Sequence, residues 1–268
     1  MNKLFVTGDI HGELTERISY KKHPELRNLD TTDVIVFCGD FGIPFGINMP
    51  DYKRSWYKKD KYELEQANKK PFTILALCGN HSDRDAIKQM PIVEKFGMVV
   101  HQMKFDNKVY DNIFYIDTPQ IANINDYRCL FIPGAASRDI DVILEPDEDN
   151  LKHRIKALND KNVLYRINHW TWWEDEDVDI TATHELMNTD NNFNKHYDFV
   201  FTHESPALWE LNGYGGGPRS CPTEGQTFLE SLRKHLDFDV WFHGHQHMDF
   251  QYPEDERITC IYHNIFEL

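Results

Sequence analysis

The sequence predicts an α/β fold in which helices pack against two β-sheets, and three observations carry this prediction. First, short apolar runs rich in β-branched residues recur along the chain, each stopped by Gly, Asn or His, which is typical of buried strands. These runs begin at Leu4, Val34, Phe72, Phe199 and Val240. Second, helical patterns separate several of the runs, so the early part of the chain should form βαβ units with crossover helices. The helical patterns span about residues 13–29, 52–68, 82–89 and 223–235.

The third observation is a change of character between residues 98 and 132. Apolar runs at 99–103, 113–116 and 129–132 are separated by short polar turns, which indicates hairpins instead of crossovers. This stretch predicts a second sheet. The tail alternates in the same manner at 250–252 and 258–262, which is compatible with a return to that sheet.

Residues 137–196 are acidic, aromatic and helical in character, and we interpret them as an insertion or cap. Within this segment Thr171 and Glu174 have the spacing of a capping box, and the acidic run 174–179 is typical of a helix start. No Pro-, Gly- or Ser-rich linker separates the segment from the rest. We therefore expect one domain over residues 1–268.

Charge limits the partners of this chain of 268 residues. The 29 Lys and Arg residues against 44 Asp and Glu residues give a formal net charge of −15, which argues against extended nucleic acid and anionic membrane as partners. A small anionic substrate remains compatible, because divalent cations in a site dominate the local potential.

The cysteines and the apolar pattern predict a reduced, cytoplasmic protein without a membrane anchor. The five cysteines are scattered and show no C-x-x-C spacing. The N-terminus reaches a charged residue too early for a signal-peptide core, and no run of about 18 apolar residues occurs.

Polar motifs follow or close the predicted strands. In an open α/β sheet, loops that leave the carboxyl ends of strands converge on one crevice, so the motifs should share one pocket. In chain order they are Gly8–Gly12 (GDIHG), Gly39-Asp40, Gly79-Asn80-His81, Thr202-His203 and Gly244–His247 (GHQH).

The side chains of these motifs form a mixed oxygen and imidazole set. Such a set suits Mn, Fe, Zn, Co or Ni and suits calcium poorly. Two such ions about 3.5 to 4 Å apart can share a hydroxide and clamp the oxygens of a displacement at phosphorus. The candidate ligands are Asp9, His11, Asp40, Asn80, His203, His245 and His247.

The ordered motifs resemble the calcineurin-like metallophosphoesterase superfamily, whose signature runs GDxHG, GD, GNH, a lone His and GHxH. The resemblance spans Asp9 to His247 and implies a four-layer αββα sandwich, two facing mixed β-sheets flanked by helices. It also implies His81 as the catalytic histidine, which stabilises charge on the phosphoryl group or protonates the leaving oxygen in its protonated form. The implied ligand sets are Asp9, His11, Asp40 and His247 for one metal, and Asp40, Asn80, His203 and His245 for the other, with Asp40 bridging.

The sequence departs from the family pattern in two places. Much of the superfamily has G-D-x-x-D, whereas this chain has Ile43 at the last position, so the carboxylate that often orients the catalytic histidine is missing. Asp83 and Asp85 are candidates to replace it. Cys78 and Ser82 flank the GNH motif, which argues against the R-G-N-H-E branch of protein serine/threonine phosphatases. The segments 133–138 and 169–174 look like those of prokaryotic and phage members.

Three arginines, Arg84, Arg138 and Arg219, are candidates to bind a substrate phosphate, with plain surface charge as the alternative. Arg219 ends a glycine-rich stretch, 213–219, which is either a surface loop or a lid. The Trp170, Trp172 and Trp173 cluster is more often packing than a stacking platform. Strand alternation should turn His243 away from the ligands.

The sequence thus predicts hydrolysis of a phosphomonoester or phosphodiester by a hydroxide that bridges two divalent metals. Manganese is the first choice of metal, with Fe, Zn, Ni or Co as alternatives. A small phosphate ester is the expected substrate, with nucleotides included. Two alternatives remain, a nuclease or nucleotide phosphodiesterase, and a non-catalytic metal-binding scaffold of the same fold.

Overall fold

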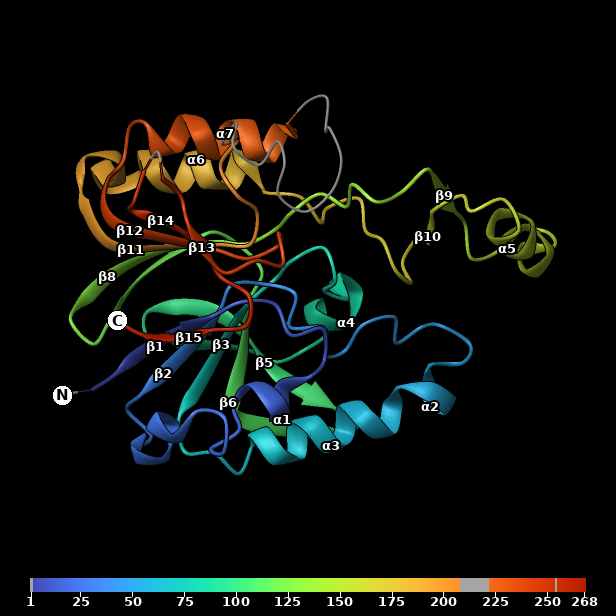
Figure 1. Ribbon diagram of the computed structural model, residues 1–268, viewed down its shortest axis with the longest axis horizontal. Helices are drawn as coiled ribbons and strands as arrows, with labels where there is room; N and C mark the ends of the chain where they lie inside the picture. Colours follow the sequence, from blue (N-terminus) through green and yellow to red (C-terminus); the bar gives the residue numbers. More distant parts are fainter. Residues whose placement is uncertain (1, 208–221, 254) are drawn as a thin grey trace.

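The computed structural model describes residues 2–207, 222–253 and 255–268. Two mixed β-sheets face each other and helices cover their outer faces (Figure 1). This arrangement confirms the predicted four-layer αββα sandwich. No helix in the described part of the chain has the length and apolar character needed to traverse a bilayer.

The first sheet has seven strands in the order β15-β1-β2-β3-β6-β5-β4. The inner four strands, β1, β2, β3 and β6, run parallel. At one edge β15 pairs antiparallel with β1, and at the other β5 pairs antiparallel with β6 and β4 antiparallel with β5. The bounds are β1 Leu4–Thr7, β2 Val34–Phe37, β3 Thr73–Leu77, β4 Ile92–Lys95, β5 Met98–Phe105, β6 Lys108–Ile116 and β15 Ile265–Glu267.

The second sheet has six strands in the order β13-β14-β12-β11-β8-β7. Strands β14, β12, β11 and β8 are parallel, and β13 and β7 pair antiparallel at the two edges. The bounds are β7 Gln120–Ile124, β8 Tyr127–Ile132, β11 His196–Thr202, β12 Asp237–His243, β13 Phe250–Gln251 and β14 Ile258–Cys260.

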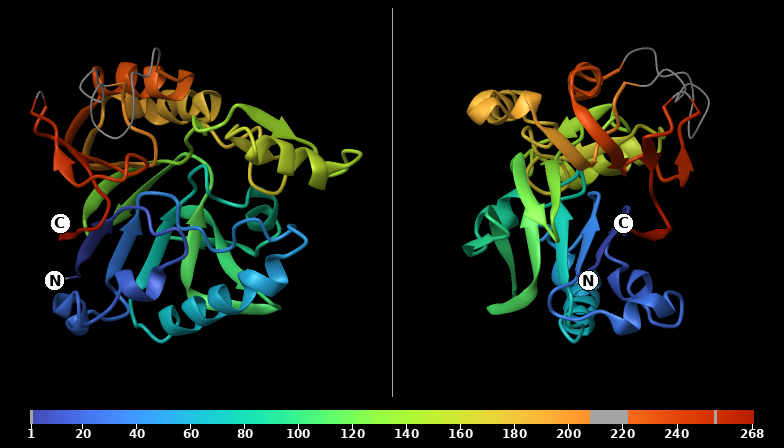
Figure 2. Two further views of the ribbon diagram at one scale, coloured as in Figure 1. Left: turned by 45° about the vertical axis from the view of Figure 1, so that its right-hand side comes forward. Right: turned by 90° about the vertical axis from the view of Figure 1, so that its left-hand side faces the viewer.

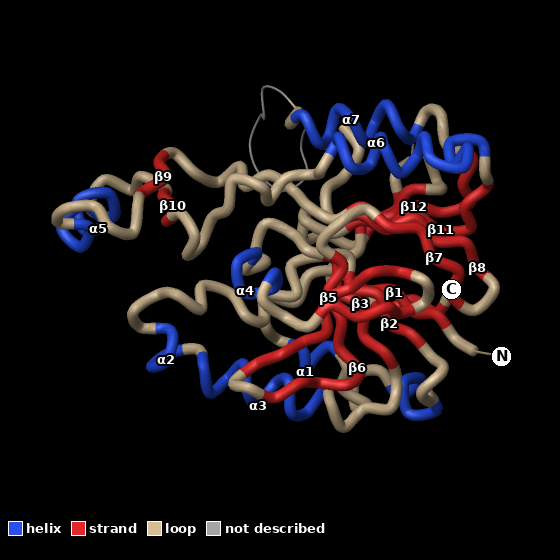
Figure 3. Tube along the Cα trace, turned by 180° about the vertical axis from the view of Figure 1, so that it is seen from behind, coloured by secondary structure: helices blue, strands red, loops and turns tan. Residues whose placement is uncertain are grey.

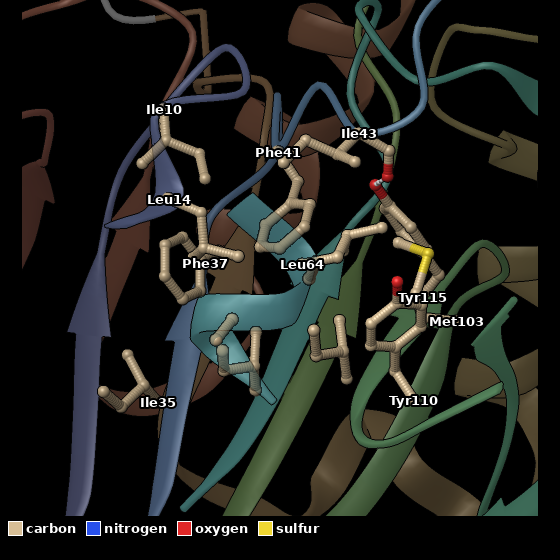
Figure 4. Close-up of a cluster of buried hydrophobic side chains, with 14 of the residues drawn as sticks. Ile10, Leu14, Ile35, Phe37, Phe41, Ile43, Leu64, Met103, Tyr110 and Tyr115 are labelled. Carbon is tan, nitrogen blue, oxygen red and sulfur yellow. Dashed lines mark hydrogen bonds between the residues drawn. The ribbon is translucent and has the colours of Figure 1, made fainter. Parts of the chain in front are cut away.

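Successive side chains along the strands point alternately into two hydrophobic cores, one on each face of the sheet. In β1 and β2, Leu4, Val6 and Val36 point into the core between the sheets, whereas Phe5 and Ile35 point to the outer core under the helices. All of these side chains are buried, as expected for parallel strands covered on both faces. Figure 4 shows part of the outer core, where Leu14 and Leu64 from two helices pack over the first sheet.

Helices α1 and α3 lie outside the first sheet, and α6 and α7 lie outside the second sheet (Figures 1 and 2). The bounds are α1 Leu14–Arg17, α2 Tyr52–Ser55, α3 Tyr57–Ala67, α4 Arg84–Lys88, α5 Leu151–Asn159, α6 Ile180–Asn188, α7 Glu224–Arg233, and the 3-10 helices η1 Pro24–Asn28 and η2 Thr189–Asn194. The expected helix at 13–29 is therefore two short helices, since α1 ends at Arg17 and Pro24 opens η1. The one at 52–68 divides at Trp56.

The expectation that the whole stretch 98–132 forms the second sheet is wrong. The β5–β6 hairpin joins the first sheet, because β6 pairs in parallel with β3. The following β7–β8 hairpin does enter the second sheet, and the tail strands β13 and β14 join it there.

The segment predicted as an insertion comprises two pieces. Strands β9 Val142–Leu144 and β10 Tyr165–Ile167, with α5 between them, project from the body (Figures 1 and 3). Helix α6 instead packs on the second sheet through Met187. The predicted capping box is wrong, because Thr171 lies in a turn and its hydroxyl accepts from the Ile167 amide. The helix begins later, and Asp179 caps it by accepting from the Ala182 amide.

Candidate metal centre

The loops that carry the motifs leave the carboxyl ends of strands in both sheets. Loops after β1, β2 and β3 bring Asp9, Asp40 and Asn80 from the first sheet, and loops after β11 and β12 bring His203 and His245 from the second. The structure brings these side chains together where the two sheets meet. The convergence follows from strand direction, as expected for an open α/β sheet.

Two glycines allow the loops of opposite sheets to approach each other. A Cβ at Gly79 would lie 2.3 Å from Asp40 Oδ1 and 2.4 Å from His203 Cδ2. A Cβ at Gly39, whose φ is +97°, would lie 2.0 Å from His203 Nδ1. Only glycine fits at such positions.

Four of the candidate ligands have left-handed backbone conformations that non-glycine residues rarely adopt. The φ angles are 45° for His11, 40° for Asp40, 65° for His245 and 52° for His247. Such strain clusters at functional sites, where it aims side chains that a relaxed turn would direct elsewhere.

Asp40 lies between two groups of potential ligands. Its Oδ1 lies 3.2 Å from His203 Nε2, and its Oδ2 lies 3.9 Å from His11 Nε2. Asn80 Oδ1 is also 3.2 Å from His203 Nε2, and His245 completes this first group. Ligand atoms of Asp40, His203 and His245 all lie within 4.8 Å of one another.

The second group consists of Asp9, His11 and His247, again with ligand atoms within 4.8 Å of one another. His247 Nε2 lies 3.3 Å from Asp9 Oδ2 and 2.9 Å from His11 Nε2. Two imidazole nitrogens and a carboxylate oxygen therefore converge on one point. All seven predicted ligands are thus gathered at one place, which is what a two-metal centre requires.

The buried carboxylates of the candidate centre favour the binding of cations. Asp9 and Asp40 are 0% and 1% exposed, and burial alone would raise the pKa of each carboxyl. The surrounding histidines, His203 foremost, together outweigh this effect, so the pKa of Asp9 is lowered and that of Asp40 is held well below its usual range. In return, although burial opposes its charged form, Asp40 and Asp9 raise the pKa of His203 to about 9.

Glu204 is a buried carboxylate that the sequence motifs did not indicate. Its Oε1 accepts from the Ser205 amide and from Gln226 Nε2, at 2.9 and 3.1 Å. Its Oε2 has no hydrogen-bond partner among the described residues and lies 3.9 Å from His245 Nε2. An unpaired buried carboxylate oxygen beside a candidate ligand fits a centre that gains positive charge when it binds metal. The donor set and this unpaired oxygen both match divalent cations.

His81 lies beside the two groups. Its amide donates to Asp40 Oδ1 at 2.8 Å, and its ring lies 5.0 Å from the rings of Phe45 and His11. Burial, helped by Arg166, lowers the pKa of His81 to about 4. The ring is therefore neutral at pH 7, whereas the family resemblance implies a protonated ring.

The partner of His81 is not one of the predicted carboxylates. Asp83 caps α4, and Asp85 accepts from Trp173 Nε1. Arg166 from β10 contacts the ring instead, with Nη2 at 3.5 Å from His81 Nε2, and the same nitrogen donates to both carboxylate oxygens of Asp139. Neither Arg166 nor Asp139 belongs to a motif, so sequence reasoning had no signal for them.

The three candidate arginines have different positions. Arg84 is 5% exposed, and its guanidinium donates to the carbonyls of Asp117 and Glu176, which argues against contact with substrate. Arg138 donates to Gln226 Oε1 at 2.9 Å and lines a cavity of about 310 Å³ together with Asn80. Arg219 and the glycine-rich stretch 213–219 lie outside the described residues.

Two other expectations concern aromatic side chains. Trp173 is 1% exposed and packs against Phe45 at 5.9 Å between ring centres, which agrees with the packing interpretation. His243 is fully buried and hydrogen-bonded to the Tyr252 hydroxyl at 3.0 Å. It belongs to none of the candidate metal groups found among the described residues.

A two-sheet α/β protein with paired Asp/His/Asn clusters at its strand ends has the architecture of a dinuclear metallohydrolase. The calcineurin-like phosphoesterase family model matches residues 3–249, and the chain belongs to this family. Membership supports phosphoester hydrolysis as the general reaction.

The sequence matches no curated protein. Among solved structures, the chain is similar to a dimetal phosphatase from Danio rerio, with 10% identity, TM-score 0.45, and coverage of 97% of this chain and 86% of that one. It is also similar to a phosphopantetheinyl hydrolase from Mycobacterium tuberculosis, with 12% identity, TM-score 0.39, and coverage of 97% and 89%. At these TM-scores the likenesses carry no weight for function.

Proposed function

We propose that the protein hydrolyses a small phosphomonoester or phosphodiester at a centre of two divalent metal ions. The observation that carries the proposal is the position of Asp40, whose two oxygens face different groups of ligands. Asp9, His11, Asp40 and His247 would hold one ion, and Asp40, Asn80, His203 and His245 the other. When bound, the ions supply a hydroxide nucleophile at neutral pH and neutralise phosphoryl charge. Manganese is our first choice, since this donor set accepts several borderline ions.

The chain itself supplies positioning and proton transfer. The loops of both sheets fix the ligands, and burial keeps bulk water from their carboxylates. His81 would stabilise the phosphoryl oxygens or give the proton on its imidazole to the leaving oxygen. An anionic phosphate beside the ring favours this protonated form, because a nearby negative charge raises the pKa of an imidazole.

The test is hydrolysis of p-nitrophenyl phosphate and bis-p-nitrophenyl phosphate by metal-stripped protein, resupplied with Mn, Ni, Zn or Mg. We expect turnover that depends on metal, and the faster substrate distinguishes a monoesterase from a diesterase. Two bound ions without turnover of either ester would favour the non-catalytic scaffold instead.

Two substitutions separate metal binding from chemistry. Asp40→Ala should abolish binding of both ions, because both ligand groups lose a member. His81→Ala should keep metal content near normal and lower kcat by about 10² to 10⁴. His235→Ala, which removes an exposed histidine just after α7, serves as the control and should change neither metal content nor kcat. Normal turnover in His81→Ala would contradict the proposed role.

A further inference from the structure

A second cavity adjoins the metal centre. It has a volume of about 330 Å³, and its walls include Phe45, Met49, Trp56 and Lys59, with His11 and His81 at the side that faces the metal ligands. We call it the aromatic pocket. The cavity that contains Asp40 and Asn80 has about 310 Å³ and is also lined by His81. His81 therefore stands between a cavity lined by metal ligands and a cavity lined by apolar side chains.

The walls of the aromatic pocket offer flat apolar surface. Trp56 is 50% exposed, although most large aromatic side chains of this protein are buried. Phe45 is half-buried and packs its ring against His81. Exposed indole beside a catalytic cavity is a typical anchor for a ligand, because covering it removes apolar area from water and allows stacking.

The charged groups in these walls already have partners. Asp60 is buried and accepts from the Tyr52 hydroxyl. Lys59 lies 3.6 Å from a carboxylate oxygen of Glu13, and its Nζ is 5.9 Å from the centre of the Trp56 ring. Among the residues that the structure describes, the pocket thus has no cluster of cations that would hold a second phosphate. Its chemistry suits an uncharged ring.

We propose that the aromatic pocket receives the leaving group of the ester, and that this leaving group carries a flat aromatic ring. The inference rests on the proposed function. With phosphorus at the metal ligands, the P–O bond that breaks lies next to His81, which lines both cavities. The ring attached to that oxygen then extends into the aromatic pocket, against Trp56. A nucleoside and a simple aryl alcohol share this chemistry.

The experiment compares phenylphosphonate with methylphosphonate as inhibitors of the metal-loaded protein. The two share a headgroup, differ by the ring, and are not hydrolysed. We expect phenylphosphonate to bind at least about tenfold more tightly, because stacking on an aromatic side chain contributes appreciably to binding. Trp56→Ala should reduce this preference about tenfold, and Trp56→Phe should retain most of it.

The control is Tyr62→Ala, which removes another exposed aromatic side chain from α3, 54% exposed and outside the pocket. It should leave both inhibition constants unchanged. Equal binding of the two phosphonates to the wild type, or an unchanged preference in Trp56→Ala, overturns the inference. Either result is compatible with metal-dependent turnover of p-nitrophenyl phosphate, whereas absence of that turnover contradicts the proposed function itself.

Turnover measurements distinguish an aryl leaving group from a nucleoside leaving group. Values of kcat/KM for phenyl phosphate and for nucleoside monophosphates rank an aryl against a nucleoside leaving group, and loss of either activity in Trp56→Ala supports the inference. If glycerol phosphate, which has no ring, is the best substrate and is equally impaired by Trp56→Ala, the inference is overturned.

Discussion

At Gly79 the candidate metal centre leaves no room for a side chain. A methyl group there would lie 2.3 Å from Asp40 Oδ1 and 2.4 Å from His203 Cδ2. Ordinary contacts between heavy atoms begin near about 3.5 Å, so Gly79→Ala must displace both side chains by about 1 Å. Both belong to the group of ligands around Asp40.

A displacement of about 1 Å in a catalytic arrangement can lower the rate by about 10²-fold. For Gly79→Ala we therefore expect kcat/KM to fall by about 10² or more, equivalent to about 2.7 kcal/mol of barrier. Metal content, measured by mass spectrometry after gel filtration, should fall as well. Turnover of p-nitrophenyl phosphate with saturating metal would show whether excess ion restores the geometry.

Gly97→Ala is the matched control. Gly97 lies between β4 and β5 with φ +76°, and a Cβ there meets nothing within 4 Å. The control should cost about 1 to 2 kcal/mol of stability from backbone strain and leave metal content and kcat/KM unchanged. Full metal content and normal turnover in Gly79→Ala would refute the steric reasoning.

Two further predictions concern buried carboxylates. Glu204→Gln should weaken metal binding by about 10- to 100-fold in a chelator competition, because it removes a buried negative charge that lies 3.9 Å from His245 Nε2 and favours bound cations; unchanged affinity would exclude that contribution. Burial raises the pKa of Asp60 from 3.8 to about 6. The contribution of Asp60 to the free energy of unfolding is therefore fully present below pH 3.8 and is lost as pH rises through about 6. Relative to Asp60→Asn, the wild type should therefore lose about 1.4 kcal/mol of unfolding free energy between pH 5 and pH 8, measured by urea denaturation. The same difference in unfolding free energy between the wild type and Asp60→Asn at pH 5 and at pH 8 would contradict this prediction.

The sequence was sufficient to predict the layers of the fold and the place of the candidate site. Strands such as β1 and β2 are short, apolar and directly followed by polar motifs, so periodicity located them and strand direction located the site. Pairing between distant strands is not encoded in periodicity. The β5–β6 hairpin was recognisable from its sequence. Its place in the first sheet follows from the parallel pairing of β6 with β3, which periodicity does not reveal.

The parts of the site that were missed depend on contacts over long sequence distances. Arg166 reaches His81 from a projecting strand pair, 85 residues away in the chain. Glu204 follows a candidate ligand directly, yet only the packing of α7 shows that Gln226 occupies one of its oxygens and leaves the other unpaired. Neither residue type is unusual at its position, so no local pattern could distinguish it from surface charge.

The left-handed backbone at His11, Asp40, His245 and His247 has a consequence for how this protein would respond to selection. Each such residue costs about 1 to 3 kcal/mol, and the cost is present whether or not metal is bound. Replacement by glycine relieves that cost and destroys a candidate ligand at once. A screen for thermostability in metal-free medium, without an activity readout, would therefore enrich variants that lack a candidate ligand, such as His11→Gly. If these four residues hold the ions as proposed, stability and catalysis oppose each other there, and directed evolution of a more thermostable variant should hold them fixed.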